Sequence, residues 1–333
     1  MLRILGVVCR LFRDVAGGLT ILVLVGLLTA CGASTSGLAP YHQLSTFRQD
    51  GLPTGPVHVP PPSVLAYLRT LDERPDYFAY LPNQEEREQL QREIDVLPPL
   101  LRRTFEERVV GIYFVSDFAS SALTEWVADE DDTIYSFMIL HPDVLRLSAG
   151  ELMTRRDFTC FSNDASETTL QIESNASALF YILAHEGTHA ADYSFRITDY
   201  TDSGSREIQE RALPDGGGFG NEYWEEYDRP FARFDFPGRD QISFYGFGSG
   251  PQMPLAEAPR VYAELAGRPF ASMYGSQNRA EDIAELVALN HLVRQGYEYS
   301  VLVGNAGQEP QRYRPLDFPG VRARLPGLER FYE

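Results

Sequence analysis

Cysteine is scarce in this chain of 333 residues, which contains only three. Cys9 and Cys31 both belong to the first 31 residues, so Cys160 is alone in the remainder. A lone cysteine excludes a disulfide framework there, and it excludes a zinc site built from several thiolates. We expect Cys160 to be a buried packing residue, with a reactive thiol or an intermolecular crosslink as the alternatives.

Positive charge is also in short supply. The chain has 29 Lys and Arg against 47 Asp and Glu, a net charge of -18. Nucleic acid is therefore not an expected partner, because binding a phosphate backbone requires clustered basic residues. Adsorption to an anionic bilayer through charge alone is disfavoured for the same reason. The hydrophobic share of 44% nevertheless indicates an ordinary globular body with a substantial core.

No apolar run near the N-terminus reaches the roughly 20 residues that span a bilayer. Residues 1–31 instead combine basic Arg3, Arg10 and Arg13 with an apolar stretch at 19–28 and small residues before Cys31. This layout predicts a secretory signal peptide. An uncleaved membrane anchor with an incidental cysteine is the alternative, and both place the body outside the cytoplasm.

Residues 28–31 (LTAC) resemble the lipobox of bacterial lipoproteins. The resemblance implies that Cys31 is acylated, for example with palmitate, and becomes the first mature residue. Gly32 in place of Asp implies transfer to the outer membrane, with the protein facing the periplasm. Residues 32–62 are rich in Gly, Ser, Thr and Pro and are expected to form a solvated tether. The globular domain is then expected over 63–333.

Helical and strand patterns alternate in this domain and indicate an α+β fold. Ser174 is the expected N-cap of the helix that carries the motif discussed next. A long irregular region is expected over 198–259, and a wrapping extension after Tyr299. The predicted helices are 83–96, 174–195 and 279–294, and the predicted strands are 108–118 and 133–140.

The strongest motif is His185-Glu186-Gly187-Thr188-His189, set in an apolar helical stretch. Histidines spaced i and i+4 differ by about 40° around a helix, so both imidazoles can face one metal ion. Zinc prefers nitrogen ligands, and a catalytic zinc site keeps one position open for water. Glu186 lies on the same turn, where its carboxylate can accept a proton from that water. A solvated polar helix face is the alternative.

A third ligand is required. The candidates are histidines 42, 58, 141 and 291 or a carboxylate. Glu281 and Glu285 are the best carboxylates, because their i, i+4 spacing places both on one face of the predicted 279–294 helix. One can then bind the metal while the other accepts a hydrogen bond from the outer nitrogen of a ligating histidine.

Residues 185–192 (HEGTHAAD) and 270–281 (FASMYGSQNRAE) together resemble the gluzincin metallopeptidases, in particular the group of anthrax lethal factor and the Pro-Pro endopeptidases. The resemblance implies a zincin-like domain, with a small mixed sheet packed on the active-site helix and a mainly helical second half. It implies one Zn²⁺ per chain, with Glu281 as third ligand and Tyr274 as donor to the oxyanion. Glu285, acting on His185, and Asp192 are the outer residues expected to orient the ligands.

The span from His189 to Glu281 is 92 residues, longer than in close members of that group, and 198–259 is the expected insertion. Its aromatic and acidic run at 221–227 could be a lid, a specificity wall or a folded decoration. An extended protein substrate is expected to pair with an edge strand, for which 133–140 is the candidate. A non-catalytic envelope lipoprotein with structural zinc, and a zinc amidase acting on a cell-wall amide, remain the alternatives to a peptidase.

Overall fold

The computed structural model describes residues 38–47, 57, 59–199, 204–247 and 250–333. The predicted signal peptide, the lipidation site Cys31 and the candidate ligand His58 lie outside the described residues. Within the described ranges, no helix has the length and apolarity needed to cross a membrane.

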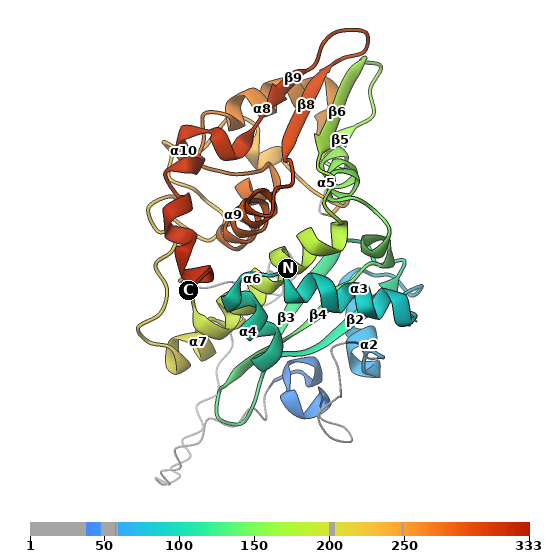
Figure 1. Cartoon of the computed structure of the whole chain (residues 1–333), viewed down its shortest axis with the longest axis vertical. Coiled ribbons are helices and arrows are strands. Elements are labelled where there is room, and N and C mark those ends of the chain that lie inside the picture. Colours follow the sequence, from blue (N-terminus) through green and yellow to red (C-terminus); the bar gives the residue numbers. More distant parts are fainter. Residues whose placement is uncertain (1–37, 48–56, 58, 200–203, 248–249) are drawn as a thin grey trace, which may run out of the picture. The chain divides into compact units, whose positions relative to one another are not determined.

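Helices and short strands alternate along the described chain (Figure 1), which is compatible with the predicted α+β class. The α-helices are α2 (Pro62–Leu71), α3 (Gln84–Asp95), α4 (Pro99–Glu107), α5 (Ala149–Phe158), α6 (Ala178–Phe195), α7 (Arg206–Ala212), α8 (Ala258–Leu265), α9 (Arg279–Arg294) and α10 (Pro319–Arg322). The strands are β1 (Phe78–Tyr80), β2 (Val109–Ser116), β3 (Ala122–Ala128), β4 (Ile134–Leu140), β5 (Phe161–Ser162), β6 (Thr168–Glu173), β7 (Met253–Pro254), β8 (Ser300–Asn305) and β9 (Gln311–Tyr313). Short 3₁₀ helices are η2 (Pro40–His42), η3 (Leu44–Phe47), η4 (Pro142–Leu145), η5 (Arg239–Gln241), η6 (Leu255–Glu257), η7 (Tyr274–Ser276), η8 (Pro315–Asp317) and η9 (Leu325–Phe331).

The largest sheet has the strand order β1-β2-β4-β3. Strands β2 and β4 are parallel, whereas β1 and β3 pair antiparallel with their neighbours. The prediction that 133–140 forms an edge strand is therefore wrong, because β4 lies between β2 and β3. The strand at this edge of the sheet is β3, next to β4. Its sequence shows no alternation of apolar and polar residues, because both faces of the strand are largely covered.

Each face of this sheet packs against a different set of helices. On one face, Ile112 and Met138 join the core that contains Leu179 of α6. On the other face, Tyr113 and Ile139 pack with Leu68 of α2. The alternation between residues 112 and 113 follows from the two-residue repeat of a strand. Helix α6 therefore crosses β3 and β4 on one face only (Figure 1).

Helix α6 begins at Ala178 and is capped by Ser177, whose side chain accepts a hydrogen bond from the Phe180 amide at 3.0 Å. The prediction of Ser174 as N-cap is therefore wrong. The Ser174 carbonyl instead accepts a hydrogen bond from the amide of Gly150, at the start of α5, at 3.2 Å. A cap bonds the second or third amide of its helix, and Ser177 alone has that spacing here.

Helix α9 packs across α6 and brings the second half of the chain onto the first (Figure 1). The segment after Tyr299 is only partly the expected extension, because β8 pairs with both β6 and β9 in an antiparallel sheet. Residues 301–304 (VLVG) alternate buried and less buried positions, which is typical of a strand. The Pro- and Gly-rich residues around this short segment concealed the pattern.

The N-terminal boundary of the folded body also differs from the prediction. Residues 38–47 were expected in the tether, but Leu44 and Phe47 are buried in the core on the α2 face of the sheet. His42 stacks on Trp126 of β3 with ring centroids 3.9 Å apart. Helix α2 then begins at Pro62, inside the expected tether, because proline is well suited to a first helical turn.

Candidate metal centre

Helices α6 and α9 bring three potential ligands together at their crossing. The Nε2 atom of His185 lies 3.1 Å from Oε2 of Glu281 and 3.2 Å from Nε2 of His189. The third separation, between Nε2 of His189 and Oε2 of Glu281, is 3.4 Å. These three side chains form a group that could hold a metal ion. The predicted choice of Glu281 over the four other histidines is consistent with this geometry.

The three separations fit a tetrahedral zinc site. Ligands about 2.0–2.1 Å from zinc at tetrahedral angles are separated by about 3.3 Å. The observed separations of 3.1, 3.2 and 3.4 Å bracket that value. Hydrogen bonds alone satisfy these groups incompletely, because two imidazole nitrogens and one carboxylate at such distances share no more than one or two protons. A metal cation can bind all three ligand atoms at once.

The electrostatics of the centre favour a positive charge. Burial alone would lower the pKa of His185, but Glu281 and Glu285 raise it to about 10. Burial alone would raise the pKa of Glu281, but His189 and His185 hold it well below its usual range. Two carboxylates thus converge on the imidazoles, and the positive charge that they stabilise can be a proton or a metal cation.

Glu285 lies behind His185, as the sequence predicts. Its Oε1 is 3.1 Å from Nδ1 of His185, on the side of the ring away from Glu281. The same oxygen accepts hydrogen bonds from the Tyr181 hydroxyl and from Nη1 of Arg156. Burial alone would raise the pKa of Glu285, but Arg156 and His185 lower it to about 2. Such a carboxylate fixes the orientation and tautomer of a ligating imidazole.

Glu186 projects from α6 toward the edge strand β3. Its Oε2 accepts a hydrogen bond of 2.7 Å from the hydroxyl of Thr124, which also bonds the Glu186 carbonyl at 3.2 Å. Burial raises the pKa of Glu186 against the opposing effects of the two histidines and Thr124. A raised pKa suits a group that must accept and return a proton near neutral pH. Thr124 was missed by the sequence analysis, which did not predict β3.

Tyr274 lies on η7, with its ring centroid 5.8 Å from that of His185. It lines the same pocket as His185 and Glu186. Burial raises the pKa of its phenol well above the usual value, so the hydroxyl stays protonated. Within the described part of the chain, that hydroxyl makes no hydrogen bond. Its placement is compatible with the role that the resemblance implies.

Arg156 of α5 is a second residue that the sequence analysis missed. It is 4% exposed, and its Nε donates to Asp157 at 2.9 Å while its Nη1 donates to the Tyr181 hydroxyl at 2.7 Å. Its guanidinium carbon lies 4.4 Å from the centre of the Tyr274 ring. Arg156 thus contacts both the carboxylate behind His185 and the tyrosine beside the centre. No local pattern indicates this, because its partner Glu285 is 129 positions away.

The 198–259 region is partly irregular, as predicted, but it also contains α7 and β7. It contributes a wall of the site. The ring of Phe244 meets Tyr274 edge-on at 4.8 Å, and Tyr245 lines the pocket with its hydroxyl 3.1 Å from that of Ser121. The pocket opens beside His185 and Glu186 and has a cavity volume of about 20 Å³, which is room for about one or two water molecules.

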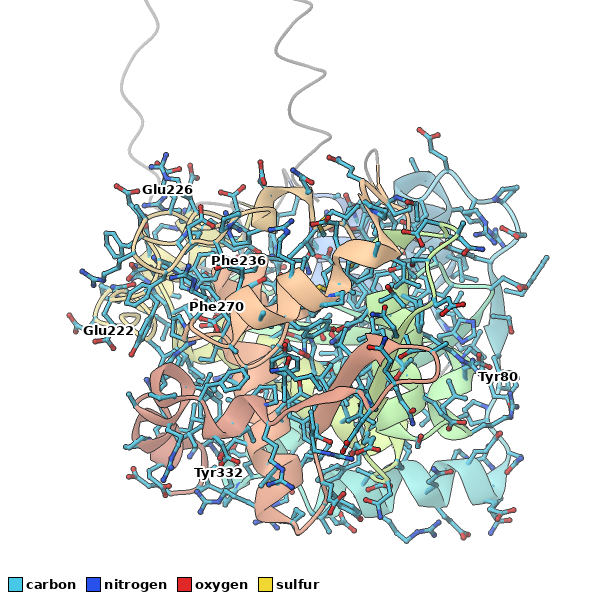
Figure 2. All side chains as sticks on the ribbon, turned by 90° about the horizontal axis from the view of Figure 1, so that it is seen from above. Tyr80, Glu222, Glu226, Phe236, Phe270 and Tyr332 are labelled. Atoms are coloured by element: carbon cyan, nitrogen blue, oxygen red, sulfur yellow. The ribbon has the colours of Figure 1, made fainter. Side chains whose placement is uncertain are left out.

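The aromatic and acidic run at 221–227 is divided between core and surface. Trp224 is 1% exposed and its indole nitrogen donates to Asp282 at 2.7 Å. Glu222 and Glu226 are exposed and lie at the rim of the molecule, whereas Phe270 lies further inside (Figure 2). The run therefore packs against the start of α9 through its tryptophan.

The remaining candidates make other contacts. Asp192 is buried, and its two oxygens accept hydrogen bonds from the amide and hydroxyl of Thr198 at 2.7 and 2.6 Å. His42 bonds the Trp126 carbonyl, whereas His141 accepts from an amide of η4 and His291 bonds the carbonyl of Val96. Cys160 is free and fully buried, as predicted.

No family model matches this chain, and neither a curated protein nor a solved structure matches it. The functional argument therefore depends on the geometry of the centre and on the chemistry of its residues.

Proposed function

We propose that this chain is a zinc-dependent peptidase with a zincin-like domain. The observation that carries the proposal is the triangle of His185, His189 and Glu281, whose ligand atoms have the mutual separations of a tetrahedral site. The carboxylate of Glu186 and a pocket adjoin this triangle. A site with three protein ligands and a free fourth position is the arrangement of catalytic zinc, whereas structural zinc has four protein ligands.

A zinc ion held by His185, His189 and Glu281 would supply a Lewis acid, which acidifies water and polarises a carbonyl oxygen. Glu186 accepts the proton of the attacking water and returns it to the leaving amine, and Thr124 holds this carboxylate in place. Tyr274 donates its phenolic proton in a hydrogen bond to the oxygen on which negative charge develops. Glu285 keeps His185 in the tautomer whose Nε2 is free to bind metal.

The edge strand β3 is the proposed docking edge for an extended substrate, in place of β4. The carbonyl of Trp126 accepts a hydrogen bond from His42, so it points away from β4. Backbone direction repeats every two residues, so the polar groups of Thr124 and Ala122 point outward as well. A peptide that paired with them would lie along β3, the strand whose Thr124 hydroxyl donates to Glu186 of α6.

The sequence of residues 1–31 supports a location in the bacterial cell envelope, with a lipid on Cys31 as the anchor. Protein or peptide in that compartment is the proposed substrate. Intact-mass analysis of the protein from the membrane fraction tests the anchor. The expected mass is that of the chain without residues 1–30 plus the mass of the lipid on Cys31.

The proposed mechanism is tested with Glu186→Gln. This change keeps the shape of the side chain but removes the base, so cleavage of a broad peptide library should fall by about 10²–10⁴-fold while about one zinc per chain is retained. Glu222→Gln, an exposed glutamate, is the matched control and should leave cleavage unchanged. A chelator should abolish cleavage, and added zinc should restore it.

Two results would contradict the proposal in different ways. A Glu186→Gln protein that cleaves as well as the parent would remove Glu186 from the mechanism. Zinc bound without cleavage of any peptide would favour one of the two alternatives. Release of the amide-linked stem peptide from purified cell wall would then identify an amidase, and its absence a non-catalytic lipoprotein.

A further inference from the structure

Arg156 is a buried charge whose presence is not explained by stability alone. It is 4% exposed, and its guanidinium pairs with Asp157 at 2.9 Å and with Glu285 at 3.2 Å. Taking such charges out of water is costly, so well-packed apolar side chains often give equal or greater stability in their place. The role of Arg156 is therefore to be found in the groups that its guanidinium contacts.

The edge of this guanidinium holds the carboxylate behind His185. Its Nη1 donates to Oε1 of Glu285 at 3.2 Å and to the Tyr181 hydroxyl at 2.7 Å, and that hydroxyl donates to the same Oε1. The oxygen also lies 3.1 Å from Nδ1 of His185. Three groups thus converge on one oxygen, and the carboxylate cannot turn without losing a hydrogen bond. The orientation of His185 therefore depends on Arg156 as well as on Glu285.

The face of the same guanidinium covers the ring of Tyr274. The guanidinium carbon lies 4.4 Å from the ring centre, a distance at which a cation is attracted to the face of an aromatic ring. Phe244 meets this ring edge-on at 4.8 Å. The Tyr274 hydroxyl makes no hydrogen bond within the described part of the chain, so contacts with the ring fix the direction in which the hydroxyl points.

Both contacts follow from the shape of arginine. A guanidinium is planar, so its donors lie in one plane, and hydrogen bonds that fix the donors also fix the direction of its face. Asp157 completes this arrangement, because its Oδ1 accepts from Nε of Arg156 at 2.9 Å and its Oδ2 accepts from the Tyr262 hydroxyl at 2.6 Å. A lysine ammonium carries the same charge but has neither the plane nor the fork of donors.

We propose that Arg156 is a positioning residue of the metal centre, which links the orientation of His185 to the placement of the Tyr274 hydroxyl. Through Glu285 it holds the imidazole in the direction that binds metal. Through its stack on the Tyr274 ring it holds the phenol where it donates to the oxyanion. This inference rests on the proposed function and adds a residue that acts on the same site without touching the substrate.

The first measurement is zinc affinity, which needs no cleavage. Arg156→Lys keeps the charge but removes the fork of donors, so competition with a chromophoric chelator should show zinc bound about tenfold more weakly by the full-length protein. Tyr181→Phe removes the other hydrogen bond to Glu285 and should act in the same direction. Arg155→Lys is the matched control and should leave the affinity unchanged, because Arg155 is 62% exposed and pairs with Asp143 at the surface.

The second measurement follows the Tyr274 ring by fluorine NMR of full-length protein labelled with 3-fluorotyrosine. The Tyr274 signal is identified by its absence from the spectrum of Tyr274→Phe. Arg156→Lys should shift and broaden this signal, because the ring loses the planar group that covers one of its faces. Arg155→Lys should leave the signal in place.

The third measurement is a double-mutant cycle on peptide cleavage at saturating zinc. Arg156→Lys should lower kcat by about tenfold with KM nearly unchanged, because a donor to the oxyanion acts in the transition state. In the Tyr274→Phe background the same change should lower kcat by less than about threefold, because the hydroxyl that Arg156 positions is no longer there. A residue that only stabilised the fold would lower kcat equally in both backgrounds.

The inference is overturned if Arg156→Lys leaves the zinc affinity or the fluorine signal unchanged, or if it lowers kcat equally in both backgrounds. If Arg156→Lys does not fold, Asp157→Asn takes its place, because it loosens Nε while Arg156 and Glu285 still balance each other. It should give the same changes to a smaller degree, and parental values would overturn the inference. If the zinc affinity and the fluorine signal change as expected but no peptide is cleaved, the peptidase proposal alone fails.

Discussion

Replacement of Glu285 by glutamine is the perturbation from which the structure predicts the most. The carboxylate is fully buried and serves His185, Arg156 and Tyr181 at once, with His185 at 3.1 Å and Arg156 at 3.2 Å. Glutamine keeps the shape but carries no charge, and one of its two terminal atoms is a donor. The change therefore weakens both the orientation of His185 and the pairing of Arg156.

Two separate magnitudes follow. Loss of a carboxylate behind a ligating histidine typically costs 10–100-fold in metal affinity, which is about 1.4–2.7 kcal/mol. Breaking a buried ion pair from one side costs about 3–5 kcal/mol of folding stability. Asp157 still pairs with the guanidinium of Arg156, so we expect a value near the lower end for stability.

The two effects are measured independently. Urea unfolding of the metal-free protein gives the stability change, and competition with a chromophoric chelator gives the zinc affinity of the folded protein. Glu329→Gln is the control, because Glu329 pairs with Arg294 at the surface and is 57% exposed. It should change stability by less than about 1 kcal/mol and affinity not at all. A Glu285→Gln protein with unchanged zinc affinity would refute the role of Glu285 in orienting His185.

Three further changes test other parts of the structure. Thr124→Val removes a hydrogen bond that lowers the pKa of Glu186, so the acidic limb of the pH profile of kcat/KM should shift to higher pH with zinc content unchanged. Burial lowers the pKa of His291 from 6.5 to about 4, so between these pH values the unfolded state binds more protons than the folded state. The free energy of unfolding, measured with urea, should therefore fall by up to about 1.4 kcal/mol for each pH unit below 6.5. His291→Gln should flatten that dependence. Gly187→Ala would place a methyl group 2.8 Å from the ring of Phe105, so thermal unfolding should show a net destabilisation of about 1 kcal/mol despite the better helix propensity of alanine.

Elements with strong local signals were predictable from the sequence. The helix predicted at 279–294 has these bounds in the structure, where Asn278 caps its first turn. The helix at 83–96 begins after Asn83, which forms a capping box with Glu86. The motif histidines share a helix face for the same reason, because i, i+4 spacing determines their direction. Each of these predictions depends on residues within about one or two helical turns of one another.

What could not be predicted depends on contacts between distant segments. Strand β3 carries Glu125 and Thr124 among apolar residues, and both are buried, so neither face shows the polar alternation that identifies a strand. Thr124 and Glu186 are 62 positions apart. Arg156 lies in a helix with exposed Arg155 and looks like one more solvated arginine until the fold places it beside Glu285. The roles of these residues follow from packing, which a single sequence does not reveal.

The long span between the two helices of the candidate metal centre makes contacts that hold the start of α9. Arg279, the first residue of α9, donates to Asp199 at 3.0 Å and to the Trp224 carbonyl at 3.1 Å. Asp282 accepts from the Trp224 indole and forms a double hydrogen bond with Arg324 at 2.8 and 2.7 Å.

Glu281 lies between Arg279 and Asp282, both of which are buried and held by these bonds. The 198–259 region and the C-terminal segment thus fix the first turn of α9 from two sides. A ligand near the start of a helix needs such support, because helix ends fray when their backbone and side chains are not held. We therefore infer that the 198–259 region stabilises the position of Glu281, in addition to walling the pocket through Phe244 and Tyr245.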